Sequence, residues 1–235
     1  MNPLWSEIAG RAGISLGDAQ HALLERYLDL LLLTNQKMNL TRITDPAAAA
    51  LQHVGDSLTV LPYLPKAACK IADVGSGGGV PGIPLAIARP DAAVTLIEST
   101  KKKALFLRET AAALELKNLT VLDLRVEDVA LGQWRESFDV AIARAVGSMI
   151  WLAEWCLPLV KKGGNVLAMK GEKAAEDLAA AKKTIRILGG GNAVVHPVIL
   201  PGSDHRVIVE IPKVAITDKR FPRPASAAKG KPLGF

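Results

Sequence analysis

A glycine-rich segment that follows a short apolar run is the clearest indication of chemistry in this sequence. The segment reads IADVGSGGGVPGIP over residues 71–84, and an acid, Asp73, is followed by Gly75, Gly77 and Gly79 at every second position. Glycine lets the backbone turn sharply and lets a ligand approach without a Cβ in the way. A buried strand that passes through such a turn into a helix is typical of nucleotide-binding loops.

The register of these glycines separates two classes of ligand. Residues 77–82 satisfy G-x-G-x-x-G, the fingerprint of dinucleotide-binding loops, in which the first glycine ends the strand. Here the strand ends at Gly75, two residues earlier, so an acid followed by alternating glycines is the better template. That template resembles the first motif of S-adenosylmethionine-dependent methyltransferases, whose cofactor carries an ammonium group that Asp73 could bind or help to organise. An NAD-linked oxidoreductase stays the alternative, without an obvious catalytic dyad.

Two further acidic positions follow the next two predicted strands. Glu98 ends the run VTLIE, 19 residues after Gly79, and a carboxylate there can accept hydrogen bonds from both ribose hydroxyls of a nucleoside. Glu127 lies in the cluster Val126-Glu127-Asp128 after the third run, which suits the adenine rim of a methyltransferase pocket. Acids at three consecutive strand ends indicate a nucleoside-containing ligand, although NAD enzymes share the acid after the second strand.

Short apolar runs that alternate with helical segments must position these residues. Seven runs are predicted strands: KIADVG, VTLIE, LTVLDL, FDVAIA, GNVLAMK, AVVHPVIL and RVIVEI. Such alternation is typical of a parallel sheet that is covered on both faces. The last two runs are separated by Pro201-Gly202-Ser203-Asp204, which resembles a turn, so we expect the last strand to be antiparallel. The runs predict an α/β fold with a seven-stranded sheet.

Residues 1–65 are predicted to form a helical extension that precedes the sheet. Ser15-x-x-Asp18 resembles a capping box, and apolar residues recur at helical spacing after it. After a loop, Pro46 begins a second predicted helix that runs to about Val60.

Charge is unevenly distributed along the chain. The formal net charge is +6, and the segment 213–235 accounts for +5 of it, with six basic residues against one acid. Its prolines fix φ and remove backbone donors, so we expect an extended, poorly ordered tail that contacts a polyanionic partner. The expected sheet domain at 66–212 lies between the extension and this tail.

The composition excludes several classes of protein. With 49% hydrophobic and 22% charged residues, the chain is not intrinsically disordered as a whole. Cys69 and Cys156 form no CxxC pair, so we expect no disulfide framework, no zinc site and no other metal. Because we find no signal-peptide pattern and no apolar run of about 20 residues, we expect a soluble, cytoplasmic protein without membrane contacts.

Several motifs along the chain form a specific set: Asn39-Leu40-Thr41, His53-x-x-Asp56-Ser57, DVGSGGGVPGIPLAI, Glu98-Ser99-x-Lys101-Lys102, Arg125-Val126-Glu127, Ala143-Arg144-Ala145 and Met169-Lys170-Gly171. Together they resemble the RsmG (GidB) family of ribosomal RNA guanine-N7 methyltransferases. The resemblance runs from about residue 15 to 212, and Lys219-Arg220-Phe221-Pro222-Arg223 resembles a tail found in part of the family.

The resemblance implies a fold, a reaction, a cofactor and a partner. The fold is the Rossmann-like sheet of class I S-adenosylmethionine-dependent methyltransferases, preceded by an N-terminal helical extension. The reaction is methyl transfer from S-adenosylmethionine to N7 of guanine 527 of 16S ribosomal RNA, which is met as naked RNA, as the small ribosomal subunit or as an assembly intermediate. Guanine N7 bears a lone pair and no hydrogen, so it can attack the methyl group in line without a general base. We expect a monomer. A non-catalytic RNA-binding module with a vestigial pocket is the remaining alternative.

The resemblance also assigns cofactor contacts by motif. They are Gly75, Val80, Glu98, Ser99, Thr100, Val126, Glu127 and Arg144. The template of an acid followed by alternating glycines adds Asp73, Gly77 and Gly79 as cofactor-binding candidates. Many relatives have Asp where Glu98 stands, and the longer side chain keeps the charge while changing its reach toward a ribose.

Five residues are candidates for positioning the substrate: Arg144, His53, Asp56, Asn39 and Lys170. Arg144 follows the fourth predicted strand, where it could contact the cofactor, contact an RNA phosphate or hold a carboxylate; a surface ion pair is the structural alternative. His53 and Asp56 share a helical face, where they could position the guanine, close the extension over the site or form a structural hydrogen bond. Asn39 and Lys170 are expected at the edge of the site.

Basic residues at two places are candidates for binding RNA. Lys101 and Lys102 begin a predicted helix, where the helix dipole disfavours cations, so an external phosphate is an attractive partner and a solvated face is the alternative. Lys219, Arg220 and Arg223 of the tail would extend the same phosphate-binding rim.

Overall fold

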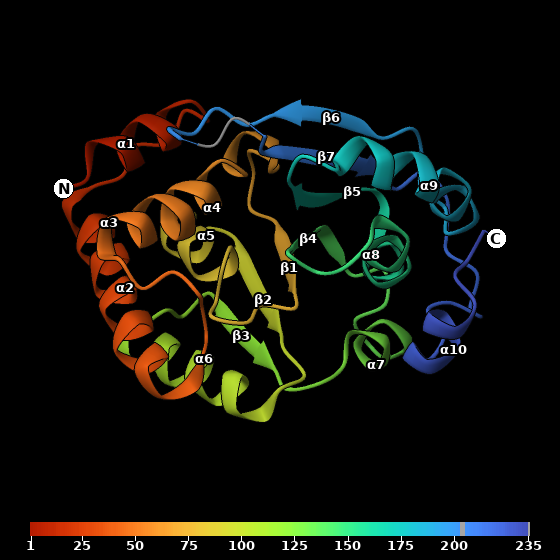
Figure 1. Cartoon of the computed structure of the whole chain (residues 1–235), viewed down its shortest axis with the longest axis horizontal. Helices are drawn as coiled ribbons and strands as arrows, with labels where there is room; N and C mark the ends of the chain where they lie inside the picture. The colour runs from red at the N-terminus through yellow and green to blue at the C-terminus, as the bar shows by residue number, and fades with distance from the viewer. Residues whose placement is uncertain (203–204, 235) are drawn as a thin grey trace.

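The computed structural model describes residues 1–202 and 205–234 and is built around one seven-stranded sheet (Figure 1). The strands are β1 (Lys70–Val74), β2 (Ala93–Ile97), β3 (Leu119–Leu122), β4 (Phe138–Arg144), β5 (Val160–Lys170), β6 (Val194–Pro197) and β7 (Val207–Pro212). Their order is β3-β2-β1-β4-β5-β7-β6; the first five pair in parallel, and β7 is antiparallel to both β5 and β6. The predicted α/β class and the antiparallel last strand are confirmed.

Helices cover both faces of this sheet. The α-helices are α1 (Pro3–Gly10), α2 (Asp18–Met38), α3 (Pro46–Ala49), α4 (Asp56–Leu58), α5 (Gly82–Ala88), α6 (Lys101–Ala113), α7 (Val126–Leu131), α8 (Met149–Cys156), α9 (Ala174–Ile187) and α10 (Ala225–Gly230). Successive residues of β1 point to opposite faces. Ile71 therefore belongs to one buried cluster, with residues of α2, α5 and α6, whereas Ala72 belongs to the other, with residues of α7, α8 and α9. Figure 1 shows these two groups of helices on either side of the sheet. Within the described part of the chain, no helix is long and apolar enough to cross a membrane.

The N-terminal extension differs from the prediction at both of its main helices. α2 begins after Gly17, whose N–H donates to Oε1 of Gln20 at 3.0 Å, so the predicted cap at Ser15 is wrong. The predicted second helix is divided into α3, a π-helical turn at Ala50–Gly55 and α4. The π-helix is rare and occurs frequently at functional sites, and this turn carries His53.

The last two strands form the predicted hairpin. Val194 pairs with Glu210 and Pro197 with Val207. The predicted turn includes Ser203 and Asp204, which lie outside the described residues.

The C-terminal segment packs onto the sheet domain, so the prediction of a poorly ordered tail is wrong for its described residues. Phe221 is buried, and Arg223 donates from Nε and Nη2 to the two carboxylate oxygens of Glu154 in α8, at 2.7 Å each. Lys213 is buried too, with Nζ 3.2 Å from the Glu136 carboxylate. Proline content and charge therefore misled the prediction, because part of the charge neutralises the buried Glu154 and the partly buried Glu136.

Candidate active site

Two cavities lie at the carboxyl ends of the central strands, the edge at which open α/β sheets bind ligands. The first, which we call the acidic cavity, has a volume of about 170 Å³ and is lined by Val74, Gly75, Ile97, Glu98, Ser99, Leu124, Arg125, Val126, Glu127, Val146 and Trp155. The second, which we call the extension cavity, has a volume of about 250 Å³ and is lined by Leu31, Leu40, Thr41, His53, Gly75, Ser76, Gly77, Gly78, Val80, Arg144, Ala145 and Val146. Gly75 and Val146 line both cavities, so the two adjoin.

The glycine loop leaves its backbone uncovered where it meets these cavities. Gly75, Gly77 and Gly79 have φ values of +73°, +55° and +96°, in the left-handed region that favours glycine. A Cβ at Gly75 would lie 3.0 Å from Cγ2 of Val146, and a Cβ at Gly79 would lie 2.5 Å from Cδ1 of Ile83. Gly75 and Gly77 face the cavities, whereas Gly79 is needed for packing against α5.

Asp73 lies beneath the loop and lines neither cavity. Its Oδ2 accepts a hydrogen bond from the N–H of Gly82 at 3.1 Å, while its buried Oδ1 has no hydrogen-bond partner among the described residues. Burial raises the pKa of Asp73 to about 7. Of the two roles predicted for Asp73, the geometry favours organising the loop over direct contact with a ligand.

Glu98 joins the glycine loop to the loop after β2. Its Oε2 accepts from the N–H of Gly77 at 2.9 Å, and its Oε1 accepts from the N–H of Thr100 at 2.7 Å. Glu98 and Glu127 both line the acidic cavity, and both are buried. Because each carboxylate oxygen has a further lone pair, Glu98 can still accept a hydroxyl hydrogen from a ligand. Ser99 lines the same cavity, whereas Thr100 contributes its main chain.

Arg144, at the end of β4, belongs to a buried cluster of charges. Its Nη1 lies 3.1 Å from Oδ2 of Asp56, and Nη1 of Arg206 lies 3.2 Å from the same oxygen. The side chains of Arg144 and Asp56 are only 12% and 2% exposed, and burial lowers the pKa of the former and raises that of the latter. The cluster holds two cations and one anion, and Arg144 brings this excess positive charge to the wall of the extension cavity.

His53 lines the extension cavity from the π-helical turn. Its Nε2 lies 2.9 Å from Oγ1 of Thr41, and its buried Nδ1 has no hydrogen-bond partner in the described part of the chain. Burial first, and then the charges of Arg144 and Arg206, lower the pKa of His53 to about 4. The imidazole is therefore neutral near pH 7. Asp56, predicted to act beside it, faces the arginines and does not line the cavity.

Asn39 and Lys170 lie outside the linings of both cavities. Asn39 is exposed and ends α2 with φ at 50°, a left-handed conformation that asparagine tolerates well. Nζ of Lys170 donates to the carbonyl oxygen of Gly147 at 2.8 Å and forms an ion pair with Asp177 at 2.8 Å. Asn39 therefore shapes a helix end, and Lys170 holds the loop after β4.

The predicted RNA-binding residues fall into two groups. Lys101 and Lys102 are exposed in the first turn of α6, and Lys219 and Arg220 are exposed on the C-terminal segment. The assignment of Arg223 is corrected, because its guanidinium is bound to the buried Glu154 carboxylate and is not offered to an RNA phosphate.

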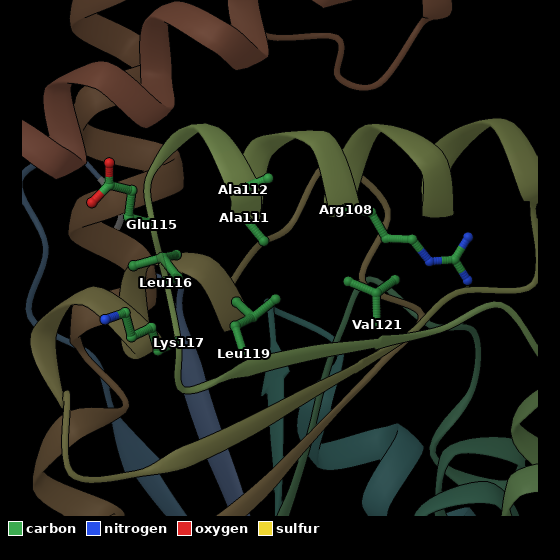
Figure 2. Close-up of a pocket in the computed structure, with 8 residues that line it drawn as sticks. All are labelled: Arg108, Ala111, Ala112, Glu115, Leu116, Lys117, Leu119 and Val121. Atoms are coloured by element: carbon green, nitrogen blue, oxygen red, sulfur yellow. The ribbon is translucent and has the colours of Figure 1, made fainter.

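A larger hollow of about 590 Å³ lies between α6 and β3 (Figure 2). Its lining comes from the second half of α6, the following turn and β3, and includes Arg108, Leu116 and Leu119. It contains none of the predicted site residues and begins at the amino end of β3, away from the glycine loop. We therefore do not assign it to the active site.

Sequence reasoning missed several residues of the site, among them Thr41, Val146, Trp155 and Arg206. Thr41 was part of a motif, but nothing in the sequence paired it with His53. The other three are brought to the site by tertiary packing, from the loop after β4, from α8 and from the start of the last strand. Among residues 1–202 and 205–234, no group of three His, Cys, Asp or Glu side chains could hold a metal ion.

Solved structures with the same fold are methyltransferases. A SAM dependent methyltransferase from Aquifex aeolicus matches with a TM-score of 0.57 and 16% identity, over 75% of this chain and 97% of that one. A variant of the 16S rRNA (adenine(1408)-N(1))-methyltransferase from Catenulisporales acidiphilia gives a TM-score of 0.50 and 14% identity, over 65% and 88% of the two chains. At these identities the likeness concerns the fold alone.

Curated relatives are much more similar in sequence. Proteins named Ribosomal RNA small subunit methyltransferase G are 41% identical over 222 residues in Chloroflexus aggregans, covering 94% of this chain and 93% of the relative, and 39% identical over 231 residues in Leuconostoc mesenteroides, covering 97% of each. The profile of the GidB family matches residues 20–202. This chain is thus a S-adenosylmethionine-dependent methyltransferase that belongs to the GidB family, rRNA small subunit methyltransferase G.

Proposed function

We propose that this enzyme transfers a methyl group from S-adenosylmethionine to N7 of guanine 527 of 16S ribosomal RNA. The observation that carries the proposal is the pair of adjoining cavities at the glycine loop. The acidic cavity suits the nucleoside half of the cofactor, and the extension cavity lies beside it for the amino acid end and the incoming base. The names of the curated relatives support ribosomal RNA of the small subunit as the substrate.

The residues of the acidic cavity fit an adenosine group. Glu98 has free lone pairs for ribose hydroxyls, and the buried Glu127 supplies an acceptor for an amino group of a base. Gly75 presents main chain without a Cβ, which lets a ligand approach closely. When bound, the cofactor supplies an electrophilic methyl group on a positively charged sulfur.

The extension cavity fits the remaining groups. Arg144 brings a cation that can pair with the carboxylate of the amino acid end or with an RNA phosphate. Leu31 and Leu40 give the cavity apolar walls, which help to exclude water from the reacting atoms.

Removal of a proton is not required in this reaction, because guanine N7 carries a lone pair and no hydrogen. The task of the protein is to hold N7 in line with the methyl group, and such positioning can contribute roughly 7–11 kcal/mol. The neutral His53 can hydrogen-bond the base without adding positive charge beside a purine that becomes cationic. We therefore assign His53 and Arg144 to positioning, and assign no residue as a general base.

Exposed basic residues serve to dock the RNA in this proposal. Lys101 and Lys102 follow directly after the Glu98-Ser99-Thr100 stretch at the acidic cavity, so a phosphate bound there lies beside the cofactor. Lys219 adds a further exposed positive charge, and Arg220 is exposed as well but forms an ion pair with Asp218. The guanine must be unstacked to enter the extension cavity. We propose that the enzyme acts as a monomer in the cytoplasm, on the small subunit or on one of its assembly intermediates.

Methylation of RNA from cells that lack this gene tests the proposal. The purified protein is incubated with labelled S-adenosylmethionine and either naked 16S RNA or small subunits, and the site is mapped by cleavage specific for 7-methylguanosine. We expect one label, at guanine 527. A label at another base, or on another nitrogen, rejects the assignment. Cofactor binding without any label would favour an RNA-binding module, and binding of NADH instead would favour an oxidoreductase.

A further inference from the structure

Val146 lies at the boundary between the acidic cavity and the extension cavity and lines both of them together with Gly75. A Cβ built at Gly75 would lie 3.0 Å from Cγ2 of Val146 and 3.9 Å from its Cγ1, so the isopropyl group faces the bare backbone of the glycine loop. Val146 therefore packs directly against the main chain of Gly75, and the two residues together form the ridge over which a ligand in both cavities must pass.

The backbone around Val146 holds it at this boundary. Its two neighbours, Ala145 and Gly147, have φ values of 57° and 61°, so the chain turns through left-handed conformations on both sides of it. For alanine this conformation costs roughly 1–2 kcal/mol, which the surrounding structure has to offset. Nζ of Lys170 donates to the carbonyl oxygen of Gly147 at 2.8 Å and also binds Asp177. The position of Val146 is thus set by the fold and by the anchored Lys170.

The size of the acidic cavity requires the cofactor to cross this boundary. Sites for small molecules usually measure roughly 300–1,000 Å³, whereas the acidic cavity measures about 170 Å³. It is too small for a whole S-adenosylmethionine, which joins an adenosine to an amino acid chain. The remainder must enter the extension cavity. The atoms that join the two halves of this cofactor are the sulfur and the carbon that links it to the ribose, and the sulfur also carries the methyl group.

We propose that the side chain of Val146, beside the backbone of Gly75, contacts the middle of S-adenosylmethionine where the cofactor crosses this ridge, and thereby positions the sulfur and its methyl group toward the extension cavity. The inference rests on the proposed function, because it uses the placement of the cofactor across both cavities. An aliphatic side chain suits this position, since it restricts the ligand by its shape and keeps water away from the methyl group without offering a competing nucleophile.

Two ligands of different reach test this role on one series of variants, Val146→Ala, Val146→Ile and Val146→Phe. Adenosine needs only the acidic cavity, whereas S-adenosylhomocysteine must cross the boundary. Titration calorimetry gives the ratio of the two Kd values for each variant, and this ratio does not depend on the fraction of protein that is folded. We expect the ratio of the S-adenosylhomocysteine Kd to the adenosine Kd to rise with side-chain size, by about tenfold or more for phenylalanine, because overpacking at the boundary opposes the ligand that crosses it more than the ligand that stays on one side.

Val126→Phe is the matched control, because Val126 lines the acidic cavity and does not line the extension cavity. It should weaken both ligands alike and leave their ratio unchanged. A ratio that stays at the wild-type value throughout the Val146 series would overturn the inference, as would an equal loss of both ligands in Val146→Phe. If wild-type protein binds adenosine but not S-adenosylhomocysteine, the proposed function itself fails, which is a distinguishable result.

Discussion

Asp56 of the N-terminal extension lies 3.1 Å from Arg144 at the end of β4, and this buried ion pair ties the extension to the central sheet. Arg206, next to the first residue of β7, approaches the same carboxylate oxygen at 3.2 Å. Three segments that are far apart in the sequence therefore meet at one oxygen atom. The wall of the extension cavity depends on this meeting point, because Arg144 forms part of it.

Asp56→Asn should lower the free energy of unfolding by about 3–5 kcal/mol, because it leaves two arginines without their buried counter-charge. Urea denaturation measures the change. The matched control is Glu7→Gln, which breaks the exposed pair between Glu7 and Arg11 and should shift the same quantity by less than about 1 kcal/mol. Equal small effects in both variants would contradict the structural role of the cluster.

The contribution of His53 to stability should depend on pH. Its pKa is about 4 in the folded protein and about 6.5 in an unfolded chain, so between these values the unfolded state binds the extra proton. Stability from the neutral imidazole is complete above pH 6.5 and is lost as the pH falls toward 4. The difference in unfolding free energy between wild type and His53→Gln should shrink by about 2 kcal/mol from pH 7 to pH 5.

Urea titrations of both proteins at the two pH values measure this difference. Asp73, whose pKa is raised to about 7, shifts stability in the opposite direction, but it is present in both proteins and cancels. A constant difference between pH 7 and pH 5 would show that His53 is not buried as a neutral ring.

Gly75→Val should weaken binding of S-adenosylhomocysteine more than about tenfold, with far-UV circular dichroism close to native. The added side chain meets Val146 at the boundary between the cavities and displaces it, and the φ of +73° adds strain. Gly163→Val separates the two causes, because Gly163 has a similar φ of +89° but open space around its Cβ position. That control should lose some stability and keep its affinity, and loss of binding in both variants would mean that strain alone is responsible.

Arg223→Leu should lower the free energy of unfolding by about 3 kcal/mol or more, because Glu154 stays buried without a partner. Arg220→Leu is the control, since Arg220 forms an exposed pair with Asp218, and its midpoint of urea unfolding should match wild type. If Arg223→Leu also leaves the midpoint in place, the C-terminal segment does not stabilise the sheet domain.

The double substitution Lys101→Ala and Lys102→Ala should weaken RNA binding and reduce its dependence on salt. Loss of two phosphate contacts lowers the slope of log affinity against log salt concentration by about two. Filter binding to a 16S RNA fragment at several KCl concentrations measures this slope. The double substitution Lys161→Ala and Lys162→Ala serves as the control. These exposed lysines lie at the amino end of β5, whereas the two cavities lie at the carboxyl ends of the strands. An equal change in both pairs would indicate a diffuse charge effect.

Local sequence patterns were enough to predict the sheet and the glycine loop. Each depends on residues that are close in sequence: an apolar run, an acid such as Glu98 at its end, and glycines at fixed spacing. Gly75 and Glu98 were therefore found at the cavities, where parallel strands end together.

Contacts between distant residues were not predictable in this way. Arg206 meets Asp56 across 150 positions, and Arg223 meets Glu154 across 69. Pairs of residues so far apart leave no periodic pattern in the sequence, so the basic tail was interpreted from its charge and its prolines. Val146 was missed for a related reason, because its role comes from facing Gly75 in space and not from a motif around it.

The pairing of Arg223 with Glu154 also has a consequence for biosynthesis. The glutamate leaves the ribosome 69 residues ahead of the arginine that neutralises it. A growing chain that has completed α8 and β5 must keep this carboxylate hydrated or bury it in its protonated form, and either choice costs free energy. Trp155, the next residue, lines the acidic cavity, so we expect docking of the last segment to stabilise one wall of the cofactor pocket.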